Sequence, residues 1–404
     1  MSKRTEEQIR LFKQFGGDGK QLLKEHPSLE NLKVFSDRRE GLLEWFDFRK
    51  GASLLSIGAG SGALIPMYLR KGLSVTVADV EEGALHLASL RAEAWETGGS
   101  ARVHLLRLPA IGKEEDAAPE AENLSGAERL VSALNREPEL KTLFDYIILD
   151  GMPDFRGKAL ADWAKEHLSE AGTLFLAADN AYGIRAFSGV ETEEGALSPE
   201  QLEAMLGGDG NIQRYYAEPM GALPDLIYSE RRLPREGELS RVIPAYGFPA
   251  CLAVDLGEKY DAVCRDGLFP RFADSFLYLW GRNQGAPAPV FVKYNRNRRP
   301  CYQLKTVIRE TEGGYQVEKE ALKEEGRDHI QAFRTRFDIL CGEQSGIRYA
   351  APVLSPDGRK VSFPWIEGRT LTELILEEIR SGREVREVLE EGIQRLVGLS
   401  LIHI

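Results

Sequence analysis

Three glycines at alternating positions, followed about twenty residues later by an acid, are the residues of this chain best spaced to do chemistry. Gly58, Gly60 and Gly62 lie in the segment LLSIGAGSGALIP, and Asp79 ends the apolar run SVTVAD. A turn almost free of side chains lets backbone N–H groups approach a ligand, beside the N-terminus of the following helix. An acid at this distance is placed to bond ribose hydroxyls. The pattern therefore predicts a nucleoside-binding turn.

The glycine spacing alone leaves the ligand open. Gly58, Gly60 and Ala63 match the G-x-G-x-x-G/A fingerprint of dinucleotide-binding enzymes. With Gly62 in place of Ala63, the same segment matches the tighter G-x-G-x-G turn of S-adenosylmethionine (SAM) enzymes. A Walker-type phosphate loop is excluded, because no Lys-Ser or Lys-Thr pair follows the last glycine. A turn with a purely structural role is the remaining interpretation.

The elements around the turn predict a doubly wound α/β domain. Short apolar runs typical of buried strands occupy residues 54–57, 75–78, 101–108, 144–149 and 173–179, and segments with helical spacing alternate with them. This alternation favours a parallel sheet with helices on both faces. Two further strands, at 212–219 and 225–230, are joined by a linker too short for a crossover helix, so this pair should be antiparallel. A sheet that ends in this way favours a SAM enzyme over a dehydrogenase, by analogy between folds.

Polar side chains follow two of the predicted strands. Asp150 comes directly after the strand at 144–149, Asp154 follows shortly, and Asn180 ends the fifth strand. Open parallel sheets bind ligands at the carboxyl ends of their strands. We therefore expect Asp150, Asp154 and Asn180 to be catalytic.

Composition narrows the class of protein. The chain has 404 residues, which suggests two domains, and a formal net charge of −11, which argues against wholesale binding to nucleic acid. Its four cysteines are scattered, so we expect neither a zinc site nor disulfides, and no other metal site. No apolar stretch is long enough to span a bilayer. We expect a cytoplasmic protein, or one peripheral to the inner membrane.

With these residues in hand, residues 51–240 resemble class I SAM-dependent methyltransferases. The resemblance is narrower to a bacterial subgroup found with cell-surface polysaccharide glycosyltransferases, and is carried by FSDRREGLLEW (35–45), FDYIILDGMPD (144–154) and LPDLIYSERRLPREGEL (223–239). It implies SAM as cofactor, a saccharide or sugar phosphate as methyl acceptor, and a glycosyltransferase partner. It assigns the cofactor contacts to Gly58, Ala59, Gly60, Gly62, Asp79, Val80, Asp150 and Gly151.

Two features of this first half keep other interpretations open. Ser56 stands where the family often has an acid before the first glycine, and LRLPAIG replaces the usual polar residue beside the adenine. A non-catalytic scaffold that binds SAM or a glycosyltransferase is therefore one alternative, and an NAD-dependent oxidoreductase is another. Residues 1–50 are expected to be helical, either as a cap over the glycine turn or simply packed on the sheet.

Residues 245–398 resemble the small lobe of a kinase-like fold. The resemblance implies strands at FADSFLYLWG (272–281) and around the basic tip NRNRRP (295–300), then a helix at 318–340. It places Lys305 on the ATP phosphates, with Glu325 as its helix partner and Glu324 or Glu320 as substitutes. The catalytic loop of a kinase would follow the hinge at PWIEGRTL (364–371), so we expect an incomplete lobe without kinase activity. LSLIHI (399–404) matches a translated sequencing adapter, and we expect it to be a non-native tail.

Overall fold

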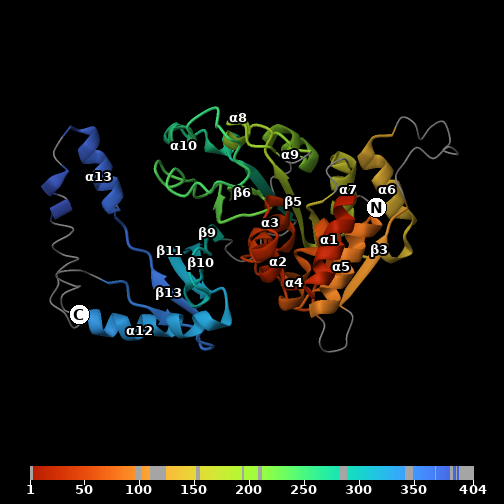
Figure 1. The fold of residues 1–404 in the computed structure, drawn as a ribbon, viewed down its shortest axis with the longest axis horizontal. Coiled ribbons are helices and arrows are strands. Elements are labelled where there is room, and N and C mark those ends of the chain that lie inside the picture. The colour runs from red at the N-terminus through yellow and green to blue at the C-terminus, as the bar shows by residue number, and fades with distance from the viewer. Residues whose placement is uncertain are drawn as a thin grey trace. The chain divides into compact units, whose positions relative to one another are not determined.

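The protein is described here by a computed structural model. It describes residues 3–95, 102–109, 124–151, 155–192, 195–207, 212–281, 289–341, 349–368, 370–382, 385–387 and 389–390. The chain divides into two compact units, Met1–Val292 and Lys293–Ile404 (Figure 1).

Unit 1 is built on a sheet with the strand order β7-β6-β8-β5-β4-β1-β2-β3. Neighbouring strands from β3 to β5 pair in parallel, as the alternation of strands and helices predicts. The strands are β1 (Ser53–Ile57), β2 (Ser74–Asp79), β3 (Val103–Arg107), β4 (Phe144–Leu149), β5 (Leu168–Asp179), β6 (Ile212–Glu218), β7 (Leu226–Ser229) and β8 (Ser275–Gly281). The predicted antiparallel pair is confirmed as β6 and β7.

Strand β8 corrects the predicted domain boundary. The sequence analysis assigned it to a second domain beginning near residue 245, but it pairs antiparallel with both β5 and β6 and so lies inside the sheet of unit 1. Six of its seven residues are buried, as expected for a strand covered on both faces. The first unit therefore continues to Val292 rather than ending at 240.

Two groups of helices accompany this sheet. The helices α4 (Ile65–Arg70) and α5 (Glu82–Trp95) contact each other and β2. In a second group, α7 (Lys158–Glu166) contacts both α6 (Gly126–Arg136) and α9 (Pro199–Leu206). Helix α9 begins with a capping box, because Ser198 and Gln201 bond each other's backbone. Helix α8 (Ile184–Phe187) follows β5, and α10 (Leu256–Arg265) and α11 (Phe269–Phe272) follow β7.

The N-terminal segment is helical, as predicted. It forms α1 (Lys3–Gln14), α2 (Gly19–Glu25), α3 (Leu29–Phe35) and the 3₁₀ turn η1 (Asp37–Leu42). Helix α1 lies beside α5, and Leu87 of α5 joins a buried cluster with Phe12 and Phe35 (Figure 1). Helix α5 therefore connects the N-terminal helices to the sheet.

Unit 2 has the strand order β12-β13-β11-β10, with β9, where the chain passes from one unit to the other, beside β10. The strands are β9 (Pro289–Asn295), β10 (Leu304–Thr311), β11 (Gly314–Ala321), β12 (Val353–Leu354) and β13 (Lys360–Pro364). The helix α12 (Arg327–Cys341) packs on one face through Ile330 and Phe333, and α13 (Leu371–Arg380) follows β13. The expected helix at 318–340 is wrong in its first part, because Glu318–Ala321 belong to β11.

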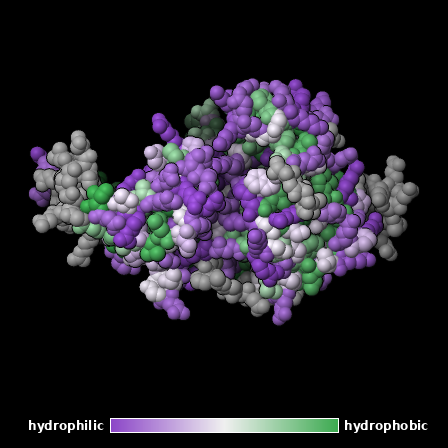
Figure 2. All heavy atoms as spheres, turned by 90° about the horizontal axis from the view of Figure 1, so that it is seen from below, coloured by the Kyte–Doolittle hydropathy of each residue, from purple (hydrophilic) through white to green (hydrophobic). Residues whose placement is uncertain are grey.

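Hydrophobic residues on the face shown in Figure 2 form several separate patches rather than one continuous surface. Among the described residues, no helix is both long and apolar enough to cross a membrane.

Candidate functional site

The glycine turn between β1 and α4 holds four residues with positive φ. Gly58, Gly60, Ser61 and Gly62 have φ of +93°, +48°, +61° and +71°. A Cβ built on Gly58 would lie 2.6 Å from Gly151 Cα, and one on Gly62 would lie 2.7 Å from Ala88 Cα. These two glycines therefore allow close packing within the protein. Nothing among the described residues lies within 4 Å of a Cβ on Gly60. This glycine therefore faces open space, where a ligand has room to contact the protein backbone.

The Asp79 carboxylate supports the glycine turn through hydrogen bonds to backbone N–H groups. Its Oδ2 accepts a hydrogen bond of 2.6 Å from the Ala59 N–H, and its Oδ1 accepts one of 2.8 Å from the Glu81 N–H. Burial raises the pKa of this carboxyl, and these backbone bonds work in the opposite direction. The side chain is 5% exposed. The Val80 N–H also bonds this carboxylate, so one of its four lone pairs remains for a ribose hydroxyl.

A small pocket lies beside the turn, lined by Arg39, Ser56, Gly60, Tyr68, Val77 and Asp150 among others. Asp150 follows β4, as predicted, and its carboxylate forms an ion pair with the Arg39 guanidinium. Arg39 also donates a hydrogen bond of 2.5 Å to the Gly221 carbonyl. The pocket therefore contains a paired cation and anion at the ends of β1 and β4.

Tyr68 of α4 contributes the polar group that sequence reasoning missed. Its side chain is 1% exposed and lines the pocket, and its hydroxyl has no hydrogen-bond partner among the described residues. Burial and the nearby Asp150 charge raise its pKa, so it keeps its proton. A buried O–H without an acceptor is costly. The hydroxyl is therefore available to a ligand oxygen.

The other predicted site residues have different outcomes. Gly151 lies against Gly58, as its position after β4 implies. Ser56 donates a hydrogen bond of 3.3 Å to the Gly58 carbonyl, so it supports the turn in place of an acid. Val80 is half-buried beside the turn's supporting acid. Asp154 lies outside the described residues.

Asn180 is buried, and its hydrogen bonds argue against the predicted catalytic role. The side chain is 0% exposed, and its Nδ2 donates to the carbonyls of Arg271 and Ala273 at 2.8 and 2.7 Å. Its Oδ1 accepts a hydrogen bond of 2.9 Å from the Tyr182 N–H. Backbone groups of the protein thus satisfy the donors and the acceptor of this amide. Among the described residues no cluster of His, Cys, Asp or Glu could hold a metal ion.

No family model and no curated protein sequence matches the chain. Solved structures do match. One is a Streptococcus mutans chain assigned as a SAM-dependent methyltransferase, at 13% identity and a TM-score of 0.35 over 61% of this chain and 50% of that one. Another is a SAM-dependent methyltransferase from Archaeoglobus fulgidus, at 11% identity and 0.36 over 64% and 96%. A third is a TehB-like SAM-dependent methyltransferase from Corynebacterium glutamicum, at 10% identity and 0.31 over 61% and 88%.

All three of these neighbours are described as methyltransferases. The match spans half the length of the Streptococcus mutans chain.

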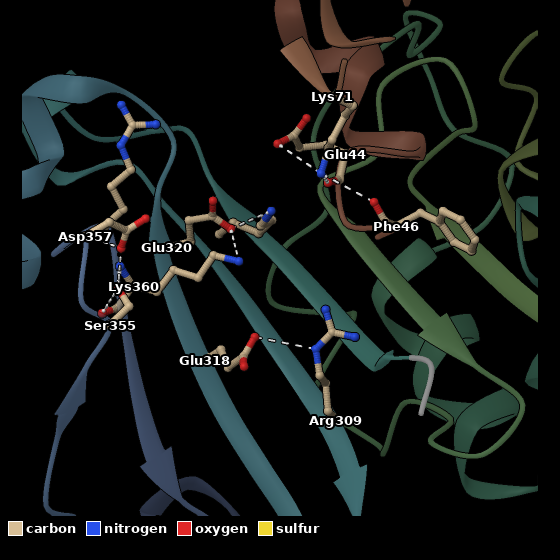
Figure 3. A network of polar contacts seen from close by, with 11 residues as sticks. Glu44, Phe46, Lys71, Arg309, Glu318, Glu320, Ser355, Asp357 and Lys360 are labelled. Atoms are coloured by element: carbon tan, nitrogen blue, oxygen red, sulfur yellow. Dashed lines mark hydrogen bonds and ion pairs between the residues drawn. The ribbon is translucent and has the colours of Figure 1, made fainter. Parts of the chain in front are cut away.

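In unit 2, Lys305 lies on β10, whereas β11 is the strand that precedes helix α12. Lys305 is buried on β10, and its Nζ pairs with Glu320 Oε2 of β11 at 2.8 Å. Glu320 also faces Lys360 at 3.6 Å (Figure 3). Glu325, the predicted partner, lies in the short turn η7 (Glu324–Gly326) instead of on α12. Lys305 therefore pairs with Glu320, which the sequence analysis named as a substitute for Glu325, and this acid lies on β11 rather than on a helix.

Proposed function

We propose that the chain is a SAM-dependent methyltransferase that transfers a methyl group to an oxygen of a saccharide or sugar phosphate. The observation that carries the proposal is the opening at Gly60. It lies at the ends of β1 and β4, beside Asp79 and the pocket of Asp150 and Tyr68. Ligands of open parallel sheets bind at these strand ends.

The position of β8 supports SAM over a dinucleotide. In the dinucleotide-binding fold the sixth strand continues the parallel sheet next to the fifth. Here β8 lies between β5 and β6 and is antiparallel to both. The sequence associates SAM enzymes with an antiparallel pair at the end of the sheet, which β6 and β7 form. Strand β8 adds an antiparallel strand beside β5 that the sequence did not predict.

The residues present fit a nucleoside that also carries an amino-acid group. The open Cβ position of Gly60 leaves room for the ligand, and Asp79 has a lone pair for a ribose hydroxyl. The unpartnered Tyr68 hydroxyl can donate to an anionic oxygen. SAM, when bound, supplies an electrophilic methyl group. What the chain must add is alignment of the acceptor and exclusion of water.

The Arg39–Asp150 pair supports an oxygen acceptor. A hydroxyl that attacks a methyl group must lose its proton, and the Asp150 carboxylate is a described acid in the pocket that can accept it. A phosphate acceptor carries its own negative charge, which the Arg39 guanidinium can hold. The polysaccharide setting and a glycosyltransferase partner belong to the same proposal, on the strength of the segments at 35–45 and 223–239.

Calorimetry with SAM, S-adenosylhomocysteine and NAD tests the proposal. We expect SAM and S-adenosylhomocysteine to bind and NAD not to bind. NAD binding without SAM binding would favour the oxidoreductase. SAM binding without methyl transfer to any saccharide or sugar phosphate in a panel assayed with methyl-labelled SAM would favour the scaffold.

A second candidate function concerns nucleotide phosphates on unit 2. Lys319 of β11 pairs in register with Thr306 and Val361, on the sheet face that packs against α12, whereas Lys305 lies on the opposite face. The pKa of Lys319 is lowered by burial and by the nearby cations Lys293 and Arg298. An anion would relieve this repulsion.

We therefore move the proposed phosphate contact from Lys305 to Lys319. Calorimetry with MgATP checks it with a matched pair of variants. Lys319→Ala should weaken ATP binding, and Lys305→Ala should leave it unchanged. The reverse result would restore Lys305, and no binding to the parent chain would remove the candidate.

A further inference from the structure

Arg91 of α5 lies between the glycine turn and the N-terminal helices. It is 9% exposed. Its Nε donates a hydrogen bond of 2.8 Å to the Ser61 carbonyl, and its Nη2 donates to the Val34 carbonyl of α3. The guanidinium also lies over the rings of Phe12 and Phe35, 5.4 and 5.7 Å from their centroids. One side chain thus joins the turn to α1 and α3.

The carbonyl that Arg91 holds belongs to a strained residue. Ser61 has φ +61°, and among the described residues it is the single non-glycine residue with positive φ. This conformation is unfavourable for a residue with a Cβ, and it persists where the surroundings enforce it. Gly62 gives Arg91 the necessary space, since a Cβ there would lie 3.1 Å from Arg91 Cδ.

Arg91 keeps its positive charge in this position. Burial lowers its pKa to about 10, which still leaves it protonated near neutral pH. Its guanidinium donates hydrogen bonds to carbonyl groups of the turn and of α3. A charged donor makes the stronger kind of hydrogen bond to a carbonyl. The charge therefore strengthens its hold on Ser61.

A second contact joins the same two regions. Thr5 of α1 donates a hydrogen bond of 3.0 Å from its Oγ1 to Glu81 Oε1, and the Glu81 N–H bonds Asp79. The N-terminal helices thus reach both the glycine turn and the segment that carries the ribose-facing acid. Helices α1 and α3 therefore reach the turn, as a cap would. Trp45 and Phe46, by contrast, pack on strands of the sheet, so residues 1–50 combine both expected arrangements.

We propose that Arg91 is a positioning residue for the cofactor. It holds Ser61 in the left-handed conformation, which sets the direction of the turn's N–H groups, and it makes cofactor affinity depend on the docking of α1 and α3. The effect on cofactor affinity rests on the proposed function, whereas the effect on the conformation of the turn does not.

A double-mutant cycle tests this role, because glycine adopts positive φ without strain. Arg91→Met should weaken S-adenosylhomocysteine binding about 10-fold in calorimetry and speed amide hydrogen exchange of residues 59–62 in the ligand-free protein. Ser61→Gly alone should bind within about twofold of the parent. The double variant should recover most of the lost affinity, because a glycine at this position no longer needs to be held.

Arg185→Met is the matched control. Arg185 is also buried, donates to the carbonyls of Pro244 and Tyr246, and lies over the Phe248 ring at 5.0 Å. Its loss should lower the melting temperature without altering S-adenosylhomocysteine affinity or exchange in the turn. If Arg91→Met fails to fold, Arg91→Lys, which keeps the charge, should show a smaller loss with the same rescue by Ser61→Gly.

The outcomes separate the two proposals. Parent-like affinity and turn exchange in Arg91→Met would overturn the positioning role, as would a double variant no better than Arg91→Met. A parent chain that binds no S-adenosylhomocysteine would instead overturn the proposed function. Faster turn exchange in Arg91→Met, reversed in the double variant, would still support the positioning role.

Discussion

Two places on the same edge of the unit 1 sheet differ in how far their polar groups are open to a ligand. At the ends of β1 and β4, Gly60 faces open space and the Tyr68 hydroxyl has no partner among the described residues. At the ends of β5 and β6, where β8 begins, the polar side chains are buried and bonded to the protein itself. Strand ends of both kinds carry polar residues. The unpartnered Tyr68 hydroxyl lines a pocket and makes a candidate site. At the closed place the side chains bond to one another and to the backbone, and the buried Glu218 Oε2 is the oxygen there without a partner among the described residues.

The closed place is a network around two carboxyl groups. Glu218 Oε1 accepts a hydrogen bond of 2.9 Å from the Asp274 N–H. The Asp274 carboxylate accepts hydrogen bonds from the Tyr260 hydroxyl and from the Arg185 N–H. Asn180 adds its bonds to Arg271 and Ala273. These side chains tie the segment before β8 to the ends of β5 and β6.

The sharpest test of the open place is Gly60→Val. Its side chain would enter the open space, so we expect S-adenosylhomocysteine affinity to fall by at least about 100-fold, the scale of losing two charge-assisted contacts. Gly267→Val is the control, since Gly267 also has positive φ (+71°) and nothing within 4 Å of its Cβ. Both variants carry the same backbone strain, so equal binding by both, measured by calorimetry, would contradict the assigned pocket.

Asn180→Ala tests the closed place. It removes both donors to buried carbonyls, and we expect the free energy of unfolding to fall by about 2–4 kcal/mol in urea titrations. S-adenosylhomocysteine affinity should stay within about twofold of the parent protein. An unaltered stability with a large loss of binding would return Asn180 to the ligand site.

The buried acid pair predicts how stability depends on pH. Burial, with Asp274 beside it, raises the pKa of Glu218 well above its ordinary value, while Arg185 opposes this and Tyr260 faces the pair through Asp274. The folded protein therefore keeps a proton that the unfolded chain loses. The stabilisation is complete below the ordinary carboxyl pKa and declines as pH rises toward the raised folded pKa, at about 1.4 kcal/mol per pH unit.

The Glu218→Gln variant tests this pH dependence, because a glutamine side chain does not bind or release a proton in this pH range. In urea unfolding between about pH 5 and pH 9, the variant should show a shallower decline than the parent protein, because Asp274, whose pKa burial also raises, still titrates. Identical slopes for the two proteins would show that Glu218 is already ionised when folded.

The smallest effect is expected for Tyr68→Phe. Loss of one hydrogen bond to the ligand should weaken S-adenosylhomocysteine binding about 5- to 10-fold. The melting temperature should hold or rise, because a buried hydroxyl without a partner is removed. Tyr228→Phe on β7 serves as the control and should bind normally. Unchanged binding in Tyr68→Phe would place the ligand oxygen elsewhere.

The sequence predicts the parallel half of the sheet and the positions of Asp79 and Asp150. These follow from short buried runs and from glycines, which are local signals. It does not predict β11, because the run of charged residues Glu318–Glu320 resembles an exposed helix, while the structure pairs these residues with β10 along a strand. Tyr68, Arg39 and Arg91 are missed because the state of their polar groups depends on distant partners.

Strand β8 also has a consequence for the order in which the chain can assemble. Its partner residues on β5 lie about a hundred positions earlier, for example Leu176 opposite Tyr278. Pairing at such separation is slow, because a long loop must close first. Until residue 281 has left the ribosome, β5 and β6 each present an unpaired edge, which is a template for association with other chains. A fragment cut at residue 240 would keep both edges open permanently, so we expect it to aggregate, whereas one cut near residue 292 would contain the complete sheet.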